Sequence, residues 1–135
     1  MKKKLVTALF ALSCLTTVGA IATAEANPLK PGEQVFTKAM VVGKTMASSG
    51  YPGGTMTFNS NGTLTCVNYP AVINCKSWQI DPDGRLHREF IDSHTGTPVE
   101  VRAYWKLLAN NGATLQVSQT SNNSPGETTL TVSYR

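Results

Sequence analysis

The amino-acid sequence predicts a mainly β fold, in which an antiparallel meander of about eight short strands closes into a barrel behind one short helix. Three observations predict it. From residue 45 onward Thr and Val are enriched, as is typical of strands. Turn residues recur at regular intervals, and apolar residues alternate with polar ones between the turns. A meander with one apolar face can remove its exposed edge strands by closing on itself.

The first 24 residues have the pattern of a secretory signal peptide. The basic Met1 to Lys4 segment precedes a mostly apolar run over residues 5–15, and small residues follow up to Ala24. We expect cleavage after residue 24, or alternatively after residue 26, which leaves residues 25–135 as a single barrel domain. The apolar run is short and interrupted by Ser and Thr, so we expect no stable membrane span after processing. The location would then be the periplasm or the outside of the cell, with lipidation of Cys14 left open.

The net charge of +4 comes mainly from this same segment. Three of the 12 Lys and Arg residues stand in the first 24 positions, which hold no acid, so nine basic residues face eight acidic ones in the remainder. A net charge of +1 provides no basic patch to neutralise phosphates. The sequence therefore predicts no nucleic-acid partner.

A short helix is expected after Pro31, because proline favours the first helical position and Glu33 adds an acid to the first turn. Phe36 and Met40 would lie on its apolar side, and Gly43 stands where a helix end favours glycine. A strand over residues 35–42 is the competing interpretation, and the helix is favoured.

Three hairpins are expected to follow one another. Residues 55–58 and 63–66, residues 78–80 and 85–90, and residues 104–108 and 114–117 form the three strand pairs. Gly62, Gly84 and Gly112 close the three turns, where glycine tolerates the positive φ angles of tight turns. Residues 129–134 supply a last strand.

The clearest alternation runs through residues 99–107. One face of this strand carries Val99, Val101, Ala103, Trp105 and Leu107. The other face carries Glu100, Arg102, Tyr104 and Lys106, which predicts one buried and one wetted side. A barrel of eight such strands has an interior that side chains fill or that holds one small ligand.

Two cysteines remain if Cys14 leaves with the signal peptide. In an oxidising compartment, Cys66 and Cys75 most simply form a disulfide with each other. Facing positions of an antiparallel pair would satisfy the required Cα separation of about 4.4–6.8 Å. A C-x8-C metal half-site is the weaker alternative, since no second Cys/His pair has zinc spacing. We expect no metal and no cofactor.

Three sequence runs carry a resemblance to a known family. Residues 54–64 match the pattern G-T-x-x-F-x-x-D/N-G-T, residues 77–86 match G/S-x-W-x-I-x-x-D-G-R-L, and residues 42–45 resemble the G-x-T that opens a first strand. Together they are similar to small secreted bacterial lipocalin-like proteins of the calycin type, over roughly residues 32–118. The resemblance implies a lipocalin-like barrel. Because its motifs are mostly turn chemistry, it implies no particular ligand.

Arg88 is the most informative polar residue of the predicted strands. If Leu86 and Phe90 face the barrel interior, Arg88 does so as well, and a buried cation requires a carboxylate, carbonyls, an aromatic face or an acidic ligand group. The opposite strand phase would expose it. The candidate ligand-binding residues are Arg88, Trp78, Trp105, Tyr51 and Tyr69. Ordinary barrel core is the alternative role of the aromatic ones.

A second polar cluster lies within eight positions and contains His87, Glu89, Asp92 and His94. Such residues could hold a metal ion or form an acid/base pair. A solvated strand end is the favoured interpretation, and no serine-nucleophile motif is present. The sequence therefore predicts no catalytic residues and a protein that is not an enzyme.

These observations favour an exported, non-catalytic β-barrel that binds a small apolar or acidic ligand in its interior or mouth. The alternative is a secreted inhibitor, or a protein that contacts a host or partner protein through the disulfide-tethered 66–75 loop. The tip of that loop, residues 68–73, is unusually apolar for an exposed hairpin, as a docking loop would be.

Overall fold

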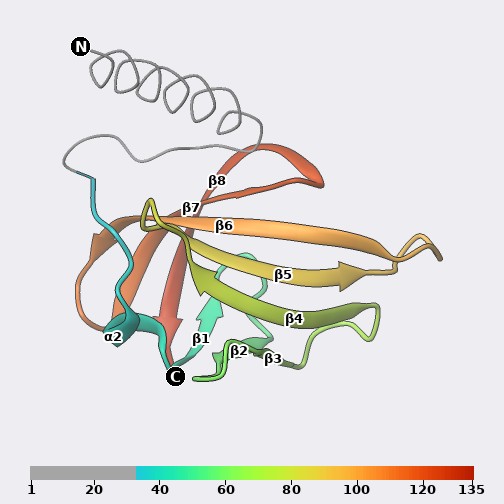
Figure 1. Cartoon of the computed structure of the whole chain (residues 1–135), viewed down its shortest axis with the longest axis horizontal. Coiled ribbons are helices and arrows are strands. Elements are labelled where there is room, and N and C mark those ends of the chain that lie inside the picture. Colours follow the sequence, from blue (N-terminus) through green and yellow to red (C-terminus); the bar gives the residue numbers. More distant parts are fainter. Residues whose placement is uncertain (1–32) are drawn as a thin grey trace, which may run out of the picture.

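Eight antiparallel strands form one sheet that curls into a nearly closed barrel in the computed structural model, which describes residues 33–135 (Figure 1). Within the described residues, one helix, α2 (Lys38–Val41), precedes the strands. The strands are β1 (Thr45–Ser48), β2 (Thr55–Phe58), β3 (Leu64–Val67), β4 (Ile73–Ile80), β5 (Leu86–Asp92), β6 (Val99–Asn110), β7 (Thr114–Ser121) and β8 (Ser124–Tyr134). The predicted mainly β fold, with eight strands in a nearly closed barrel, is confirmed.

The strand order is that of an up-and-down meander. Within the sheet the order is β3-β2-β1-β8-β7-β6-β5-β4, so strands that follow one another in the chain are neighbours, apart from β3 and β4, which form the two edges of the sheet. The first and last strands close the ring, with Met46 opposite Tyr134 and Ser48 opposite Val132. Only the edge between β3 and β4 lacks a regular ladder among the described strands.

The seam between β3 and β4 is held in two ways. Thr63 and Ser77 form an isolated bridge, and the Trp78 N–H donates to the Gly62 carbonyl at 3.0 Å. Further along, Cys66 and Cys75 lie at disulfide distance, with their Cα atoms 6.0 Å apart. The two cysteines therefore meet as predicted and tie together the edges that the hydrogen bonds leave open.

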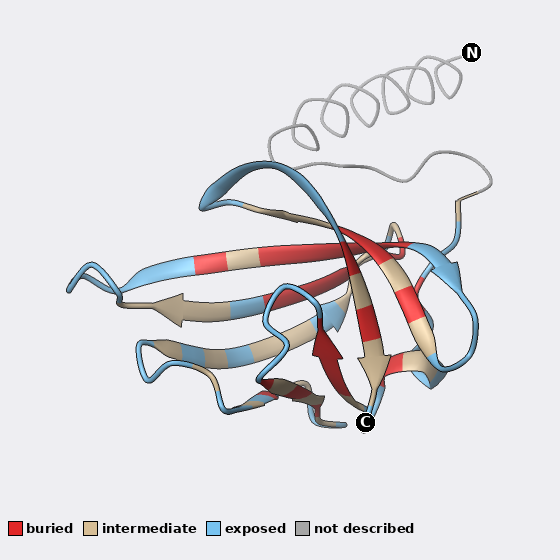
Figure 2. Ribbon diagram, turned by 180° about the vertical axis from the view of Figure 1, so that it is seen from behind, coloured by how far each residue is buried: buried red, intermediate tan, exposed pale blue. Residues whose placement is uncertain are grey.

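The two ends of the barrel differ. One end, called the closed end here, carries the turns at residues 59–63, 81–85 and 111–113 together with α2. Phe36 and Val41 are 3% and 0% exposed there, and the Phe36 N–H donates to the Gly84 carbonyl at 2.8 Å. The other end, called the open end, carries the loops at residues 49–54, 68–72, 93–98 and 122–123. Figure 2 shows the buried residues along the middle of the strands and the exposed residues in the loops.

The helix is shorter than the sequence predicts. It starts at Lys38 instead of Pro31, which lies outside the described residues, and Thr37 supplies no side-chain cap. A four-residue helix includes only part of the predicted apolar side. Phe36 lies in the segment before the helix and is nevertheless buried. The competing strand over residues 35–42 does not form, and Gly43 has a φ of 73° just after the helix.

The predicted hairpin turns are confirmed. Gly62, Gly84 and Gly112 adopt φ angles of 88°, 92° and 96°, a region that disfavours residues with a Cβ atom. The predicted signal peptide, residues 1–24, lies outside the described residues. Over residues 33–135, no helix has the length and apolar character needed to cross a membrane.

The alternation predicted for β6 correctly assigns the buried inner face, but part of the outer face is buried as well. The inward side chains from Val101 to Leu107 are buried, whereas Val99 at the open end is 44% exposed. Tyr104 and Lys106, predicted to be wetted, are each only 7% exposed. The Tyr104 ring contacts the His87 ring at a tilt of 35°, with centroids 4.7 Å apart, and the Lys106 amine lies 3.4 Å from a Glu33 carboxylate oxygen. Side chains of neighbouring segments therefore cover part of the outer face.

Candidate functional site

A cavity of about 250 Å³ lies at the open end of the barrel. Residues of β1, β2, β5, β6, β7 and β8 and of three loops line it: Ser48, Gly50, Tyr51, Met56, Tyr69, Arg88, Phe90, Val101, Ala103, Gln119, Ser121, Asn123, Ser124 and Leu130. Three of the five predicted ligand-binding residues are among them. Below the cavity, toward the closed end, packed side chains fill the barrel.

Arg88 points into the barrel because β5 alternates in the expected phase. Leu86 is fully buried, Phe90 lines the same cavity, and Arg88 between them is 4% exposed. In the register of the sheet, Arg88 stands opposite Ala103 of β6 and Trp78 of β4. Of the two strand phases that the sequence left open, β5 therefore has the one that places Arg88 inside the barrel.

The guanidinium of Arg88 has few partners. Nη2 donates to Gln119 Oε1 at 2.9 Å, Nη1 lies 3.7 Å from the Met56 sulfur, and the central carbon lies 4.0 Å from the centroid of the Trp105 ring. Nε is buried without a hydrogen-bond partner. Within residues 33–135, no carboxylate lies within ion-pair distance of Arg88. The cation is thus buried with an unused donor and no counter-charge.

Burial governs the electrostatics of the cavity. It lowers the pKa of Arg88 to about 10, an effect partly offset by the nearby Tyr69 phenol. Burial also raises the pKa of Tyr69, and the positive charge of Arg88 partly opposes that rise. Arg88 is the only charged residue among the described residues that line the cavity. The cavity is therefore positive and favours an anion.

The remaining walls divide into an apolar and a polar part. The apolar part consists of Met56, Phe90, Val101, Ala103 and Leu130. Serine and asparagine side chains stand among the other lining residues, at Ser48, Ser121, Asn123 and Ser124. A cavity with apolar walls and a single cation fits a ligand that carries one acidic group and an apolar body.

Tyr51 and Tyr69 meet at the mouth of this cavity. Their rings are stacked with centroids 4.6 Å apart, although the residues come from different loops. Tyr51 is 38% exposed, whereas Tyr69 is half-buried. The two tyrosines therefore lie between solvent and the interior that contains Arg88.

The two tryptophans take other positions. Trp105 is fully buried against Arg88, and its Nε1 donates to Gln119 Oε1 at 2.8 Å. Trp78 does not line the cavity: it packs edge-on against Phe58 at 5.9 Å, and its Nε1 donates to the Asn59 carbonyl near the closed end. The ligand-binding role of all five residues remains a prediction, and three of them share one cavity.

Gln119 is a cavity residue that the sequence reasoning did not identify. Its side-chain oxygen accepts hydrogen bonds from both Arg88 and Trp105 and so fixes the guanidinium over the indole ring. The signal was available in the alternation of β7, because Leu115 and Val117 face inward and residue 119 continues their phase.

The His87 cluster consists of separate pairs. On the outer face, His87 Nδ1 lies 3.3 Å from Asp81 Oδ1, and Nε2 lies 3.1 Å from a Glu89 oxygen without the geometry of a hydrogen bond. His94 Nδ1 lies 2.8 Å from Asp92 Oδ1 in the next loop, and the hydrogen bonds from His94 lower the pKa of Asp92. Among residues 33–135, no group of side chains has the arrangement of a metal site.

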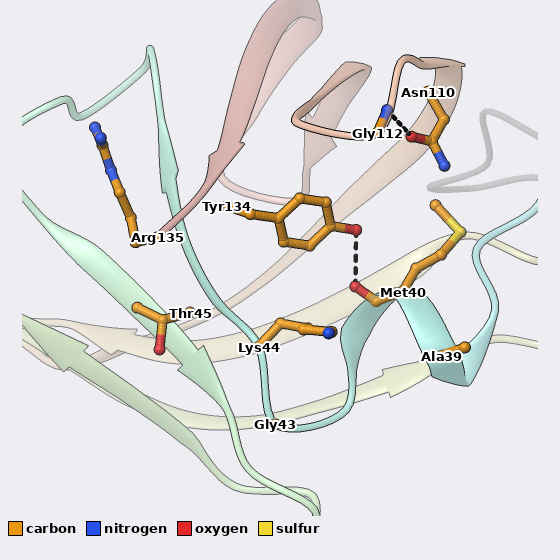
Figure 3. Close-up of a pocket in the computed structure, with 9 residues that line it drawn as sticks. All are labelled: Ala39, Met40, Gly43, Lys44, Thr45, Asn110, Gly112, Tyr134 and Arg135. Carbon is orange, nitrogen blue, oxygen red and sulfur yellow. Dashed lines mark hydrogen bonds between the residues drawn. The ribbon is translucent and has the colours of Figure 1, made fainter.

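A cavity of about 520 Å³ lies at the closed end, beside α2 (Figure 3). Its polar groups already have partners: the Tyr134 hydroxyl donates to the Met40 carbonyl at 2.9 Å, and the Gly112 N–H donates to Asn110 Oδ1 at 2.8 Å. Its two cations, on Lys44 and Arg135, are exposed to solvent. Although this cavity is larger, it contains no buried group in need of a ligand, so the open-end cavity is the stronger candidate site.

Comparison with family models, curated proteins and solved structures gives no match to this chain.

Proposed function

We propose that this protein is an exported, non-catalytic β-barrel that binds a small acidic ligand in the open-end cavity, with Arg88 holding the acidic group. The observation that carries the proposal is the buried guanidinium with an unpaired Nε and no counter-charge. Such a group is unfavourable alone and becomes favourable when an anion occupies the cavity. The resemblance to secreted lipocalin-like proteins supports the same function and extends the proposal to membership of that class.

A carboxylate is the acidic group that fits best. Its two oxygens can accept hydrogen bonds from Nε and from a neighbouring Nη of one guanidinium, a charge-assisted pair that is stronger than a neutral one. The apolar side chains of Met56, Phe90 and Leu130 would cover the body of the ligand. With about 30 Å³ for each water-sized group, the cavity holds about eight such groups. Hexanoate, with about eight non-hydrogen atoms, is a probe of matching size and charge.

Replacement of Arg88 by Met is expected to lower the affinity for hexanoate by about 10- to 100-fold, because the charge-assisted hydrogen bonds are lost while the side-chain volume is retained. Isothermal titration calorimetry of the oxidised protein provides the measurement. Hexylamine, which repels the cation, and hexanamide, which carries no charge, should bind the unchanged protein weakly.

The matched control is Lys76→Met, which removes one positive charge from an exposed position of β4. It should leave hexanoate binding unchanged. If Arg88→Met and Lys76→Met bound hexanoate equally well, or if the unchanged protein did not distinguish hexanoate from hexylamine, the proposed site would be wrong.

The 66–75 loop is better explained as part of the cavity than as a docking element. Tyr69 lines the cavity and Ile73 is half-buried. The large exposed apolar side chains of this loop are those of Val67 and Val72, which are 51% and 39% exposed, and the smaller Pro70 and Ala71 are exposed between them. Two valines and two smaller residues are a small surface for a partner protein, so ligand binding remains the favoured function.

Export makes a separate prediction. The N-terminal sequence of the protein recovered from outside the cytoplasm should begin at Glu25 or Asn27, because Ala24 and Ala26 provide the small residues that signal peptidase requires. The position of Cys66 and Cys75 at disulfide distance supports an oxidising compartment. Edman sequencing or intact mass spectrometry would identify the N-terminal residue of the recovered protein. Recovery of a soluble protein that still begins at Met1 would contradict the export.

A further inference from the structure

We infer that Tyr51 and Tyr69 form a gate over the open-end cavity, which shields Arg88 and admits acidic ligands no longer than the cavity. Their stacked rings join two loops that are far apart in the sequence, residues 49–54 and residues 68–72. The shielding of Arg88 is a property of the protein itself. The selection of ligands by length rests on the proposed function.

Tyr69 is held in place by the loop that carries it. Cys66 and Cys75 tie the base of this loop together, and Asn68, just before Tyr69, adopts the left-handed backbone conformation with a φ of 61°. The Ile73 N–H donates to the Pro70 carbonyl, and the Ser93 N–H donates to the Val72 carbonyl, each at 2.9 Å. The loop backbone is thus fixed at its base and its flank.

Glycine at position 54 gives the Tyr69 ring its space. A Cβ atom at Gly54 would lie 2.5 Å from Cε1 of Tyr69 and 2.9 Å from Cδ2 of Tyr51, which is closer than real Cβ contacts. The backbone of Gly54 has no positive φ, so close approach of the rings is what requires glycine here. The 49–54 loop is therefore shaped to receive the tyrosine of the other loop.

The contact between the two loops is weak enough to open. Within the described residues, no backbone hydrogen bond joins residues 49–54 to residues 68–72, and the ring stack connects them. Tyr51 is 38% exposed, so rotation of its side chain leads directly into solvent. A ligand that fits beneath the rings allows them to close again, whereas a longer ligand keeps them apart and loses their stacking energy.

The exchange of the Arg88 Nε hydrogen with water tests the gate without any ligand. This hydrogen has no partner, so its exchange rate depends on access of water to the cavity. We expect Tyr69→Ala to accelerate the exchange by about tenfold, as measured by 15N NMR of the full chain in its oxidised form. Gly54→Ala should also accelerate it, since the new methyl group displaces the Tyr69 ring without removing it.

Two variants serve as controls. Tyr69→Phe keeps the ring and should retain slow exchange, which separates the ring from its hydroxyl group. Val67→Ala changes an exposed side chain at the base of the same loop and should also retain it. Equal exchange rates in the unchanged protein, Tyr69→Ala and Gly54→Ala would overturn the gate.

The length selection is tested with hexanoate and dodecanoate. The unchanged protein should bind hexanoate more tightly than dodecanoate. In Tyr69→Ala, the ratio of the two affinities should fall by about tenfold, and hexanoate should dissociate faster. An unchanged preference in Tyr69→Ala would overturn the selection by the gate. Failure of the unchanged protein to bind hexanoate would instead overturn the proposed function, with the exchange result still deciding whether the gate exists.

Discussion

Replacement of Trp105 by Ala is expected to lower the free energy of unfolding by about 3–5 kcal/mol, the range typical of a large aromatic residue removed from a core. Trp105 is fully buried in the middle of β6. Its ring lies 6.4 Å from the ring of Phe58 and 4.0 Å from the guanidinium carbon of Arg88, and its Nε1 donates to Gln119. The substitution leaves a large cavity between these groups and removes the aromatic face from the buried cation.

Urea unfolding followed by circular dichroism would measure the loss, because the signal does not depend on tryptophan. Val99→Ala is the matched control: it lies in the same strand and the same phase, but its side chain is 44% exposed. We expect a loss below about 1 kcal/mol for this variant. Losses of similar size in the two variants would show that Trp105 does not hold the barrel core together.

The sequence predicts the strands well because their signals are local. The period-2 alternation from Val101 to Leu107 assigns an inner face that the structure buries, whereas the alternation around Arg88 left two phases open, of which the structure has the inward one. Gly62, Gly84 and Gly112 mark the turns because a positive φ depends on the residue itself. The pairing of Cys66 with Cys75 could be predicted because they are the two cysteines that remain after the expected signal peptide, and an oxidising compartment favours a disulfide between them.

Other features depend on contacts between distant segments, which a single sequence does not specify. The burial of Lys106 on the outer face requires Glu33, more than 70 residues earlier in the chain. The position of Tyr69 against Tyr51 requires the gap at Gly54, and the sequence alone left Tyr69 as both a candidate ligand-binding residue and part of an alternative docking loop. Trp78 and Trp105 appear equivalent as aromatic residues in predicted strands, yet only the barrel geometry places one beneath Arg88 and the other near the closed end.

Arg88→Met is expected to raise the free energy of unfolding of the ligand-free protein by about 1 kcal/mol. Burial lowers the pKa of Arg88 to about 10, a shift that corresponds to about 3 kcal/mol against the charged form in the folded state. The lost hydrogen bond to Gln119 and the lost contact of the guanidinium with the Trp105 ring each offset about 1 kcal/mol of this gain. The Gln119 oxygen keeps the Trp105 N–H as a donor, so the substitution leaves no new unpaired acceptor.

The pH dependence gives this prediction a second test. Because the folded-state pKa of Arg88 is lower than its unfolded-state value, the unfolded chain binds more protons above about pH 10, and the Arg88 contribution to stability rises only above that pH. Below about pH 10 both states are protonated, so the advantage of Arg88→Met should stay constant from about pH 5 to pH 9. Urea unfolding of both proteins at several pH values would measure this difference. A variant less stable than the unchanged protein, or an advantage that disappears at neutral pH, would show that other groups compensate the cation. A constant advantage would mean that the protein retains a buried cation that its fold does not need, which is expected of a site maintained for an anionic ligand.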